Sequence, residues 1–458
     1  MSGNSTIIRD SFSSKFGVIA AAAGSAVGLG NIWRFPLVAC QNGGSAFLIL
    51  YIGFVIIIGI PVLLSEFSIG RMAQRNAFGS FRAIAPKTKW SLVGLLGIIA
   101  AFTILAFYST VAGWTLEYFT QAVSGKLANV SDMSKNFSDF SSHPYRPLIW
   151  QLLFMILTAS VVFAGIKKGI EKLTKILMPI LVILIIAVVV RSVSLPGASQ
   201  GLHYLFVPDW SAVTFTTVLM ALGQAAFSLS IGMGALITYG SYIQKDNHLL
   251  NTSIQVAMAD TGIAILSSLM VIPAVFAFTS SGLSEFSPGP GLVFEVLPNV
   301  FKSMPGGGAF SIMFFFLLAV AALTSTISVL EVVVAFFKEE LKMSRGKATI
   351  IASVAIAALG VLATLSFGLL KDITLFNFTI FEMLNYLSAN VLLTFGALLI
   401  VIFVGWKMGK SQFYDEISNN GTIKSGIYKI IFFIIRYIAP VAIGIIAIAA
   451  FFVDGITG

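Results

Sequence analysis

The stretch GSAVGLGNIWRFP, residues 24–36, lies inside a long apolar run and contains three glycines, an asparagine, an arginine and a proline. Each of these residue types weakens a helix or disfavours membrane insertion. In hydrocarbon, backbone groups released from helical hydrogen bonds find no water to satisfy them. The stretch therefore predicts either a segment that does not cross a membrane, or a spanning helix that is interrupted for a purpose.

The composition around this stretch is that of a polytopic membrane protein. Hydrophobic residues make up 57% of the 458-residue chain and charged residues 10%, whereas soluble domains carry about 25% charged residues. The single cysteine, Cys40, excludes a disulfide framework and a cysteine metal site. Apolar runs of about 20 residues predict an all-α chain of eleven transmembrane helices, near 15–39, 44–70, 90–123, 147–165, 173–193, 213–241, 252–279, 308–337, 347–369, 378–406 and 427–453.

Basic residues in the predicted loops indicate the orientation. With the amino terminus in the cytoplasm, the inner segments hold 20 lysines and arginines and the outer segments hold 6. This asymmetry is what the positive-inside rule expects. With eleven spans, this orientation places the carboxyl terminus outside the cell membrane. The basic inner loops also explain the net charge of +9, so we expect a lipid bilayer as partner and no nucleic acid.

A second interrupted run, GQAAFSLSIGMG at residues 223–234, matches the first. Gly28–Leu29–Gly30 and Gly232–Met233–Gly234 lie 204 residues apart, in the first and sixth predicted spans. Glycines that merely allow close helix packing would explain either motif alone. Matched breaks in two five-helix halves instead predict an inverted-repeat transporter with a site near the midplane.

This interpretation divides the chain into four parts: a cytoplasmic segment 1–14, a first repeat 15–193, a second inverted repeat 194–406, and 407–458 with the eleventh helix and the carboxyl terminus. Unwound backbone supplies carbonyl oxygens for cations, and the ends of the half-helices supply N–H groups for a carboxylate.

The quoted stretches also resemble a known family. Together with NGGSAFLILY (42–51), GIPVLLSEFSIGR (59–71) and LTSTISVLE (323–331), they are similar to the neurotransmitter:sodium symporters, most closely their bacterial amino-acid branch. The resemblance runs from residue 9 to about residue 453. It implies a leucine-transporter-like fold with broken first and sixth helices. It also implies that the protein is a carrier and not an enzyme. Most members have twelve spans, and some bacterial members have eleven, as predicted here.

The resemblance implies two sodium sites. In the second, the Thr324 and Ser325 hydroxyls join carbonyl groups of Gly24, Val27 and Ala321. Hydroxyls in membrane helices also commonly bond to the preceding turn, and here three successive hydroxyl residues favour the site. The ligands implied for the first sodium are the Ala26 carbonyl, the Asn31 amide, Ser228, Asp260 and the carboxylate of the substrate.

Asp260 bears on chloride dependence as well. A carboxylate in the seventh span is costly unless a cation or a donor faces it. The register leaves two interpretations open: Asp260 replaces the sodium-binding asparagine of the family, with Ala264 at the other position, or it replaces the acid that substitutes for chloride. Tyr51, Gln224 and Ser228 match the remaining chloride-site positions. From this carboxylate we expect transport that needs no chloride.

Gly28 indicates the class of substrate. Relatives specific for amines carry an aspartate at this position, whereas glycine leaves room for the carboxylate of an α-amino acid. Tyr108 matches the family tyrosine that donates its hydroxyl to that carboxylate. The substrate-binding residues implied by the resemblance are Ser25, Ala26, Gly28, Leu29, Gly30, Ile104, Tyr108, Phe227, Ser228, Ser230, Met233, Ser325, Thr326 and Val329. Because the pocket is uncharged and Met233 is adaptable, we expect a neutral, hydrophobic or aromatic side chain.

Two gates follow from the same resemblance. At the outer gate Arg34 and Phe227 lie beyond the site, and Asn385 stands where the family usually has an acid, with Glu382 one turn away. At the inner gate Arg9 and Phe12 come from the amino-terminal segment, and Glu339 is the expected acidic partner.

Other functional classes fit less well. None of the three histidines lies in a predicted span, so an intramembrane enzyme lacks a general base, and a channel would need a continuous polar stripe. The sequence therefore predicts sodium-coupled import of an amino acid by alternating access. A proton-coupled carrier on the same scaffold, using Glu66 or Asp260, is the alternative. If Glu66 carries no proton for transport, we expect it to accept hydrogen bonds from the unwound backbone. Gly169 and Pro179 resemble the family's break at the inner end of the fifth span; an ordinary proline kink is the alternative.

Overall fold

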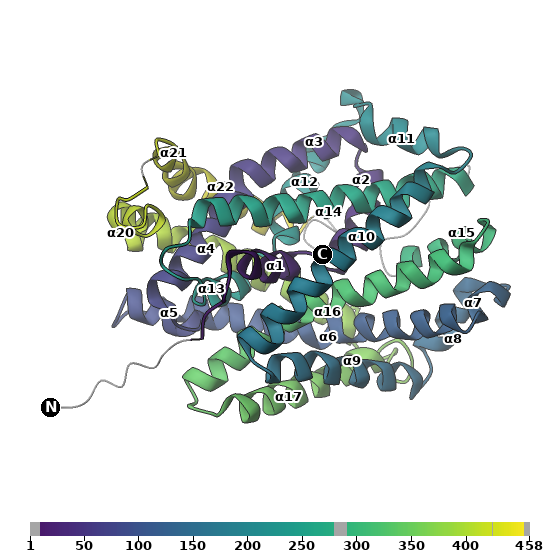
Figure 1. Ribbon diagram of the computed structural model, residues 1–458, viewed down its shortest axis with the longest axis horizontal. Helices are drawn as coiled ribbons and strands as arrows, with labels where there is room; N and C mark the ends of the chain where they lie inside the picture. The colour runs from purple at the N-terminus through teal and green to yellow at the C-terminus, as the bar shows by residue number, and fades with distance from the viewer. Residues whose placement is uncertain (1–9, 279–290, 424, 453–458) are drawn as a thin grey trace.

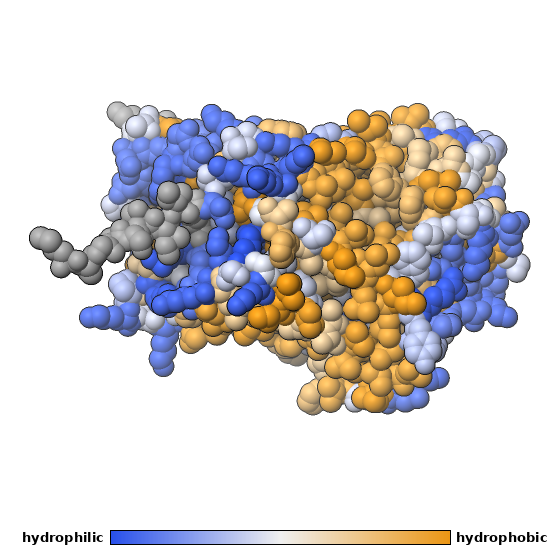
Figure 2. Space-filling model, turned by 60° about the horizontal axis from the view of Figure 1, so that its bottom comes forward, coloured by the Kyte–Doolittle hydropathy of each residue, from blue (hydrophilic) through white to orange (hydrophobic). Residues whose placement is uncertain are grey.

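The computed structural model describes residues 10–278, 291–423 and 425–452. Within these ranges the chain forms a bundle of long helices that run along one axis (Figure 1). The described strands are a two-residue hairpin, β1 Thr374–Leu375 and β2 Phe378–Thr379. Figure 2 shows a hydrophobic band between two hydrophilic ends of the molecule. That distribution is the one a bilayer-spanning protein requires.

Nine helices in the described part of the chain are long and apolar enough to cross a membrane. The first predicted span adds a tenth if its two halves, Lys15–Ala26 and Gly30–Gln41, are taken as one segment bent by 57°. The sixth is divided by its break into helices of 14 and 6 residues, each too short to span alone. This count is compatible with eleven spans, and the multi-span all-α fold class is confirmed.

The helices of the first five spans follow the predicted order. Their bounds are α1 Lys15–Ala26, η1 Gly30–Arg34 and α2 Phe35–Gln41; α3 Ser45–Phe54, η2 Val55–Gly59 and α4 Ile60–Ala73; α6 Ser91–Val123; α9 Arg146–Phe163; η3 Ile166–Glu171 and α10 Lys172–Val193. The fifth span thus begins at Ile166, before the predicted residue 173. A π-helical turn carries Lys167 and Lys168, whose charges had suggested a loop.

The helices of the remaining spans also follow the predicted order. The bounds are α12 Phe215–Ser228 and α13 Ala235–Gly240; α14 Leu249–Phe278; α16 Gly307–Glu339; α17 Arg345–Leu365; α18 Ile380–Tyr386, η6 Leu387–Leu393, α19 Thr394–Ile402, η7 Phe403–Met408 and α20 Gly409–Ile417; α21 Ile427–Phe433, η8 Ile434–Ile438 and α22 Ala439–Ala449. The tenth segment continues to Ile417, beyond the predicted 406, because the polar helix α20 follows directly. The division of the chain into repeats 15–193 and 194–406 stays a prediction.

Short helices connect the spans. They are α5 Ala77–Ile84, α7 Lys126–Asn129, α8 Met133–Ser141, α11 Ala198–Phe206, η4 Trp210–Ala212, η5 Leu292–Val296 and α15 Leu297–Ser303. In the connection after the seventh span, Phe294 packs against Trp114 of α6 and Phe137 of α8, with ring centroids 5.7 and 5.5 Å away. The described part of this connection therefore covers one end of α6.

Backbone conformation explains both interruptions. At the first, Val27 is extended, with φ −71° and ψ 108°, and ends α1. At the second, Ser230, Gly232 and Gly234 have φ of 54°, 94° and 75°, which is the left-handed region that favours glycine. A Cβ on Gly232 would lie 2.2 Å from the Leu393 carbonyl oxygen, and a Cβ on Gly396 would lie 2.5 Å from the Gly232 carbonyl oxygen. Glycine is thus required where the sixth span crosses the tenth.

The first interruption is surrounded by helices from both halves of the chain. The helix α1 packs against α10, α13, α14 and α16, and it lies near the centre of the view in Figure 1. Gly97 of α6 faces the second interruption, since a Cβ there would lie 3.1 Å from the Met233 carbonyl carbon. Both breaks are therefore enclosed by protein, where irregular backbone at membrane depth is tolerated.

Candidate functional site

Four groups converge at the first break. The Leu29 N–H donates to the Tyr108 hydroxyl at 3.1 Å. A Cβ on Gly28 would lie 3.1 Å from the Tyr108 Oη and 3.2 Å from the Ser325 Oγ. The absence of a side chain at Gly28 thus leaves a small polar space lined by a tyrosine hydroxyl, a serine hydroxyl and a backbone donor. Such donors suit a carboxylate.

A buried polar cluster lies beside this space. Asn31 accepts from the Gly28 N–H at 3.1 Å through Oδ1. Its Nδ2 donates to the Ser228 Oγ at 3.1 Å and to the Asp260 Oδ1 at 2.7 Å. The Ser228 hydroxyl donates to Asp260 Oδ2 at 2.5 Å, and the Tyr51 hydroxyl donates to the same oxygen at 3.4 Å. All of these side chains are buried, so the cluster joins the two broken helices to α3 and α14.

Asp260 contacts residues of both sets between which the sequence did not decide. Its Oδ1 faces Asn31, a predicted sodium ligand, and its Oδ2 faces Ser228 and Tyr51, which match chloride-site positions. Ala264, at the alternative position, is buried as well. Asp260 forms no ion pair with the described residues 10–278, 291–423 and 425–452. A buried carboxylate with donors alone is a group that a bound cation would stabilise.

The other predicted sodium ligands also come together. A Cβ on Gly24 would lie 3.3 Å from the Thr324 Cβ, so α1 and α16 are in close contact at this point. The Thr324 hydroxyl donates to the Ala321 and Val320 carbonyls at 3.0 and 3.3 Å, which is the local bonding that hydroxyls in membrane helices commonly adopt. Carbonyl and hydroxyl oxygens of this kind fit a hard cation such as sodium.

The predicted pocket residues lie around the two breaks. Leu29, Met233 and Val329 are buried, and Ile104 and Phe227 are partly buried. The Ser230 hydroxyl, on the second break, donates to the Ser25 carbonyl at 3.3 Å. One contact had not been anticipated: the Thr326 and Thr158 hydroxyls share a hydrogen bond at 2.9 Å, which connects α16 to α9. A lone threonine in an apolar span gives no sequence signal for such a partner.

Glu66 holds the second break, as the sequence predicts. Its Oε1 accepts a hydrogen bond from the Gly232 N–H at 2.7 Å, and the side chain is fully buried in α4. The bond satisfies a backbone donor that the break releases from helical pairing.

Two contacts are seen at Arg34, a residue predicted for the outer gate. The Arg34 guanidinium lies 4.7 Å from the centre of the Phe227 ring and donates to Gln224 Oε1 at 2.8 Å. Glu382 instead caps α18, accepting from the Thr379 N–H at 2.8 Å. The Gln224 contact was not predicted, because Gln224 had been assigned to the chloride-site positions alone. A contact of Arg34 with Asn385 stays a prediction.

Of the residues predicted for the inner gate, Arg9 lies outside the described residues. Phe12 is 2% exposed and packs edge-on against Tyr239 and Tyr242, with centroids 5.7 and 6.0 Å apart. Glu339 accepts from the Asn76 N–H at 2.8 Å. The amino-terminal segment is therefore held against α13 by aromatic packing.

Further contacts seal the same end. Glu331 pairs with Arg345 at 2.6 Å and accepts from the Tyr242 hydroxyl at 2.8 Å. Glu171 in η3 accepts from the Ser13 N–H at 2.8 Å. The fifth span is helical throughout Ile166–Val193 with Pro179 inside it, so the resemblance to a break at Gly169 and Pro179 corresponds here to π-helical and α-helical turns.

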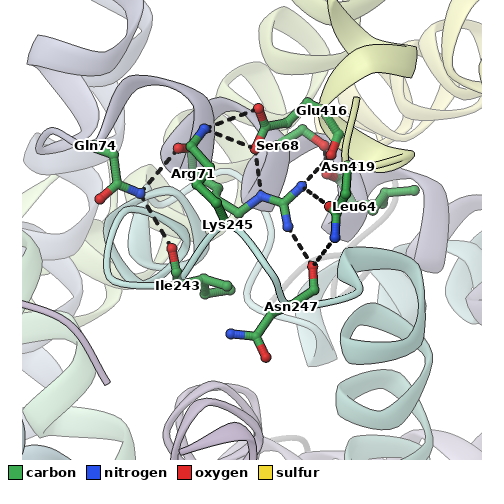
Figure 3. A network of polar contacts seen from close by, with 9 residues as sticks. All are labelled: Leu64, Ser68, Arg71, Gln74, Ile243, Lys245, Asn247, Glu416 and Asn419. Atoms are coloured by element: carbon green, nitrogen blue, oxygen red, sulfur yellow. Dashed lines mark hydrogen bonds and ion pairs between the residues drawn. The ribbon is translucent and has the colours of Figure 1, made fainter. Parts of the chain in front are cut away.

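A second buried charge cluster lies at this end of the molecule (Figure 3). Arg71, at the end of α4, is 1% exposed and pairs with Glu416 of α20 at 2.5 Å. Its guanidinium also donates to the Asn247 carbonyl at 2.5 Å and to Asn419 Oδ1 at 2.9 Å. Lys245 lies 3.3 Å from the same Glu416 carboxylate. We call Arg71, Lys245, Asn247, Glu416 and Asn419 the Arg71 cluster; it ties the second span to the loop after α13 and to α20.

The sequence interpretation missed this cluster. Arg71 had been counted only as one of the inner basic residues, and its partner Glu416 lies 345 residues away. The available signal was the arginine itself, since it directly follows an apolar span that also carries Glu66.

Comparisons with known proteins agree with this geometry. The family model for the sodium:neurotransmitter symporter family matches residues 9–143 and 129–454. An uncharacterised sodium-dependent transporter of Bacillus subtilis, YhdH, is 38% identical over 439 residues, which cover 95% of this chain and 96% of that protein. A similar transporter of Haemophilus influenzae is 37% identical over 457 residues, covering 97% and 98%.

A solved structure is similar as well. The crystal structure of MhsT in complex with L-phenylalanine is 45% identical and has a TM-score of 0.88, covering 96% of this chain and 100% of that one. Sequence similarity and fold therefore agree along almost the whole length, and the family consists of secondary transporters, not enzymes. The chain is a membrane-spanning member of the sodium:neurotransmitter symporter family.

Proposed function

We propose that this protein imports a neutral α-amino acid with a hydrophobic or aromatic side chain, driven by sodium and independent of chloride. The observation that carries this proposal is the small polar space at Gly28, which lies between the Tyr108 hydroxyl, the Leu29 N–H and the Ser325 hydroxyl. A carboxylate placed there would be adjacent to the Asn31–Ser228–Asp260 cluster. MhsT, which is similar over its whole length, was solved with L-phenylalanine, and this supports an apolar amino acid as substrate.

Two sodium ions have matching oxygen donors. The first would be held by Ala26, Asn31, Ser228, Asp260 and the carboxylate of the substrate. The second would be held by Gly24, Val27, Ala321, Thr324 and Ser325. Asp260 supplies a negative charge beside the Tyr51 and Ser228 hydroxyls, and for this reason no chloride is needed to balance the first sodium. Each sodium that enters down a membrane potential releases about 2.3 kcal/mol per 100 mV.

Alternating access uses the gates at the two ends. With the amino terminus in the cytoplasm and the carboxyl terminus outside, Arg34 and Phe227 close the outer path, and Phe12 packed on Tyr239 closes the inner path. Sodium and substrate hold the broken helices together, and the bundle of spans 1, 2, 6 and 7 then moves against spans 3, 4, 8 and 9.

A proton-coupled carrier is the second candidate, because Glu66 and Asp260 are both fully buried carboxylates. Uptake into proteoliposomes separates the two. With radiolabelled L-phenylalanine and a clamped membrane potential, we expect accumulation under an inward sodium gradient at equal pH, in chloride or in gluconate. Accumulation under a pH gradient without sodium would instead support the proton-coupled carrier. L-leucine, L-lysine and L-glutamate complete the panel, and the charged pair is expected to compete poorly.

A further inference from the structure

Arg436 is a charged residue inside the eleventh span that the transport proposal does not use. It lies in η8, within the apolar span Ile427–Ala449. Its guanidinium forms no ion pair with a described residue, and its Nε is buried without a hydrogen-bond partner among them. A charge in such a span is costly and normally marks a partner or a function.

Aromatic rings hold this guanidinium at the lipid-facing surface. Its Cζ lies 4.5 Å from the centre of the Trp406 ring and 5.5 Å from that of Tyr437. Trp406 is 57% exposed and Tyr437 is 47% exposed. The two rings meet edge to face, with centroids 5.9 Å apart. Contact with both rings orients the planar guanidinium and stabilises its charge, but within the described part of the chain it gives the N–H donors no acceptor.

The backbone is shaped to bring Arg436 to this position. The Trp406 indole N–H donates to the Arg436 carbonyl at 3.2 Å. A Cβ on Gly405 would lie 2.9 Å from the Arg436 Cα, so the close crossing of η7 and η8 requires glycine at this point. Two segments that are 30 residues apart thus form one platform.

The end of the tenth span indicates the depth of this platform. Lys407 follows Trp406 directly and Lys410 follows four residues after it; both are exposed, so the apolar run of the tenth span ends at Trp406. Tryptophan and tyrosine are typical of the membrane interface. Because Arg436 is bonded to Trp406, its guanidinium lies at the same level, with two lysines nearby in the chain. Basic pockets between helices at this level bind anionic headgroups.

We propose that Arg436, Trp406 and Tyr437 form a binding site for an anionic phospholipid. The guanidinium fork receives the phosphate oxygens through two parallel hydrogen bonds, and Lys407 and Lys410 add positive charge. The acyl chains lie along the exposed apolar side chains of Val441, Ile445 and Ile448, which follow Arg436 in the same span and are 63%, 44% and 65% exposed. This site is independent of the amino-acid and sodium site.

Quenching of tryptophan fluorescence by brominated lipids tests the proposal. The full-length protein is reconstituted with brominated phosphatidylglycerol or brominated phosphatidylcholine, and the Trp406 contribution is obtained by difference from Trp406→Phe. We expect phosphatidylglycerol to bind at Trp406 about fivefold more tightly than phosphatidylcholine, the effect of one basic residue at a membrane surface. Equal affinities of the unmodified protein for the two lipids would overturn the proposal, and this result does not depend on whether any Arg436 variant folds. It would mean that the Arg436 side chain only extends to water.

Variants and a free anion complete the experiment. Arg436→Gln is expected to abolish the preference, and Arg436→Lys to retain part of it. The matched control is Arg191→Gln, because Arg191 also lies over a ring, 5.9 Å from the centre of Phe310, but donates to the Pro305 carbonyl at 3.4 Å. A folded Arg436→Gln protein that keeps the preference would contradict the proposal. Loss of the preference in 20-fold excess inorganic phosphate would replace the lipid with a free phosphate site.

Discussion

Asp260 and Asn31 are joined by a hydrogen bond of 2.7 Å between a buried carboxylate of the seventh span and a buried amide of the first. The amide comes from the segment just beyond the first break, and the other carboxylate oxygen accepts from Ser228 at the start of the second break. One carboxylate thus connects both interruptions of the chain. Its negative charge would stabilise a cation bound between them.

Replacing this carboxylate is expected to create a need for chloride. In Asp260→Ser, the negative charge beside the first sodium is lost, and a chloride ion held by Tyr51 and Ser228 replaces it. Loss of a buried compensating charge costs roughly 3–5 kcal/mol, so uptake in gluconate should fall at least about tenfold and recover in chloride. The measurement is sodium-driven uptake in the two anions.

The control for this prediction is Ser267→Ala, which lies on the same helix and donates only to the Ile263 carbonyl, at 2.7 Å. It should remain indifferent to chloride. If Asp260→Ser also showed equal uptake in both anions, the compensating role of Asp260 would be wrong.

A methyl group at Gly28 should weaken substrate binding. The added Cβ would lie 3.1 Å from Tyr108 Oη and 3.2 Å from Ser325 Oγ, where the carboxylate is proposed to lie. Overpacking typically costs about 1–3 kcal/mol, which corresponds to a rise of roughly 5- to 100-fold in the KM for uptake of Gly28→Ala. Gly262→Ala on α14 is the matched control, since a Cβ there meets nothing within 4 Å. Equal KM values for the two variants would contradict the proposed carboxylate position.

The Tyr108 hydroxyl is expected to contribute to the same carboxylate. Tyr108→Phe removes one donor to a charged group, a bond that is worth about 1.5–3 kcal/mol, so kcat/KM for uptake should fall roughly 10- to 100-fold. Tyr428→Phe provides the comparison, because the Tyr428 hydroxyl is buried without a partner among the described residues. Normal uptake by Tyr108→Phe would show that the hydroxyl serves only the Leu29 N–H.

The Arg71 cluster should contribute strongly to stability. In Arg71→Met, Glu416 keeps only the exposed Lys245 as a cationic partner, and removal of one member of a buried pair costs roughly 3–5 kcal/mol. We expect the apparent Tm in detergent to fall by several degrees. Arg82→Met is the control, because Arg82 is 52% exposed in its pair with Glu340 and such pairs contribute about 0–1 kcal/mol. Similar losses for both variants would show that burial gives the Arg71 pair no special weight.

Local chemistry explains what the sequence could predict. The two Gly-x-Gly pairs, at residues 28–30 and 232–234, identify both breaks. At the second break, Gly232 and Gly234 have the left-handed φ angles that favour glycine. The contact of Glu66 with the second break was predicted correctly for a similar reason, since a carboxylate inside an apolar span needs donors.

Contacts between distant segments were harder to predict. The Arg34 contact with Gln224 depends on how two helices face each other, and Gln224 was known only as a match to a family position. The two sets of contacts made by Asp260 depend on the directions of its two carboxylate oxygens, which the sequence does not give. The start of the fifth span was misplaced because Lys167 and Lys168 sit in a π-helical turn with their charges exposed.

The glycine crossing at Gly232 has a consequence for motion. The Gly232 carbonyl lies against Gly396, and the Gly232 α-carbon lies against the Leu393 carbonyl. The Gly232 N–H donates to Glu66. The kink in the sixth helix cannot straighten by itself, because the second and tenth helices occupy the space on either side. Any movement of the sixth helix at this kink must displace the second and tenth helices with it. The three helices therefore behave as a single hinged unit.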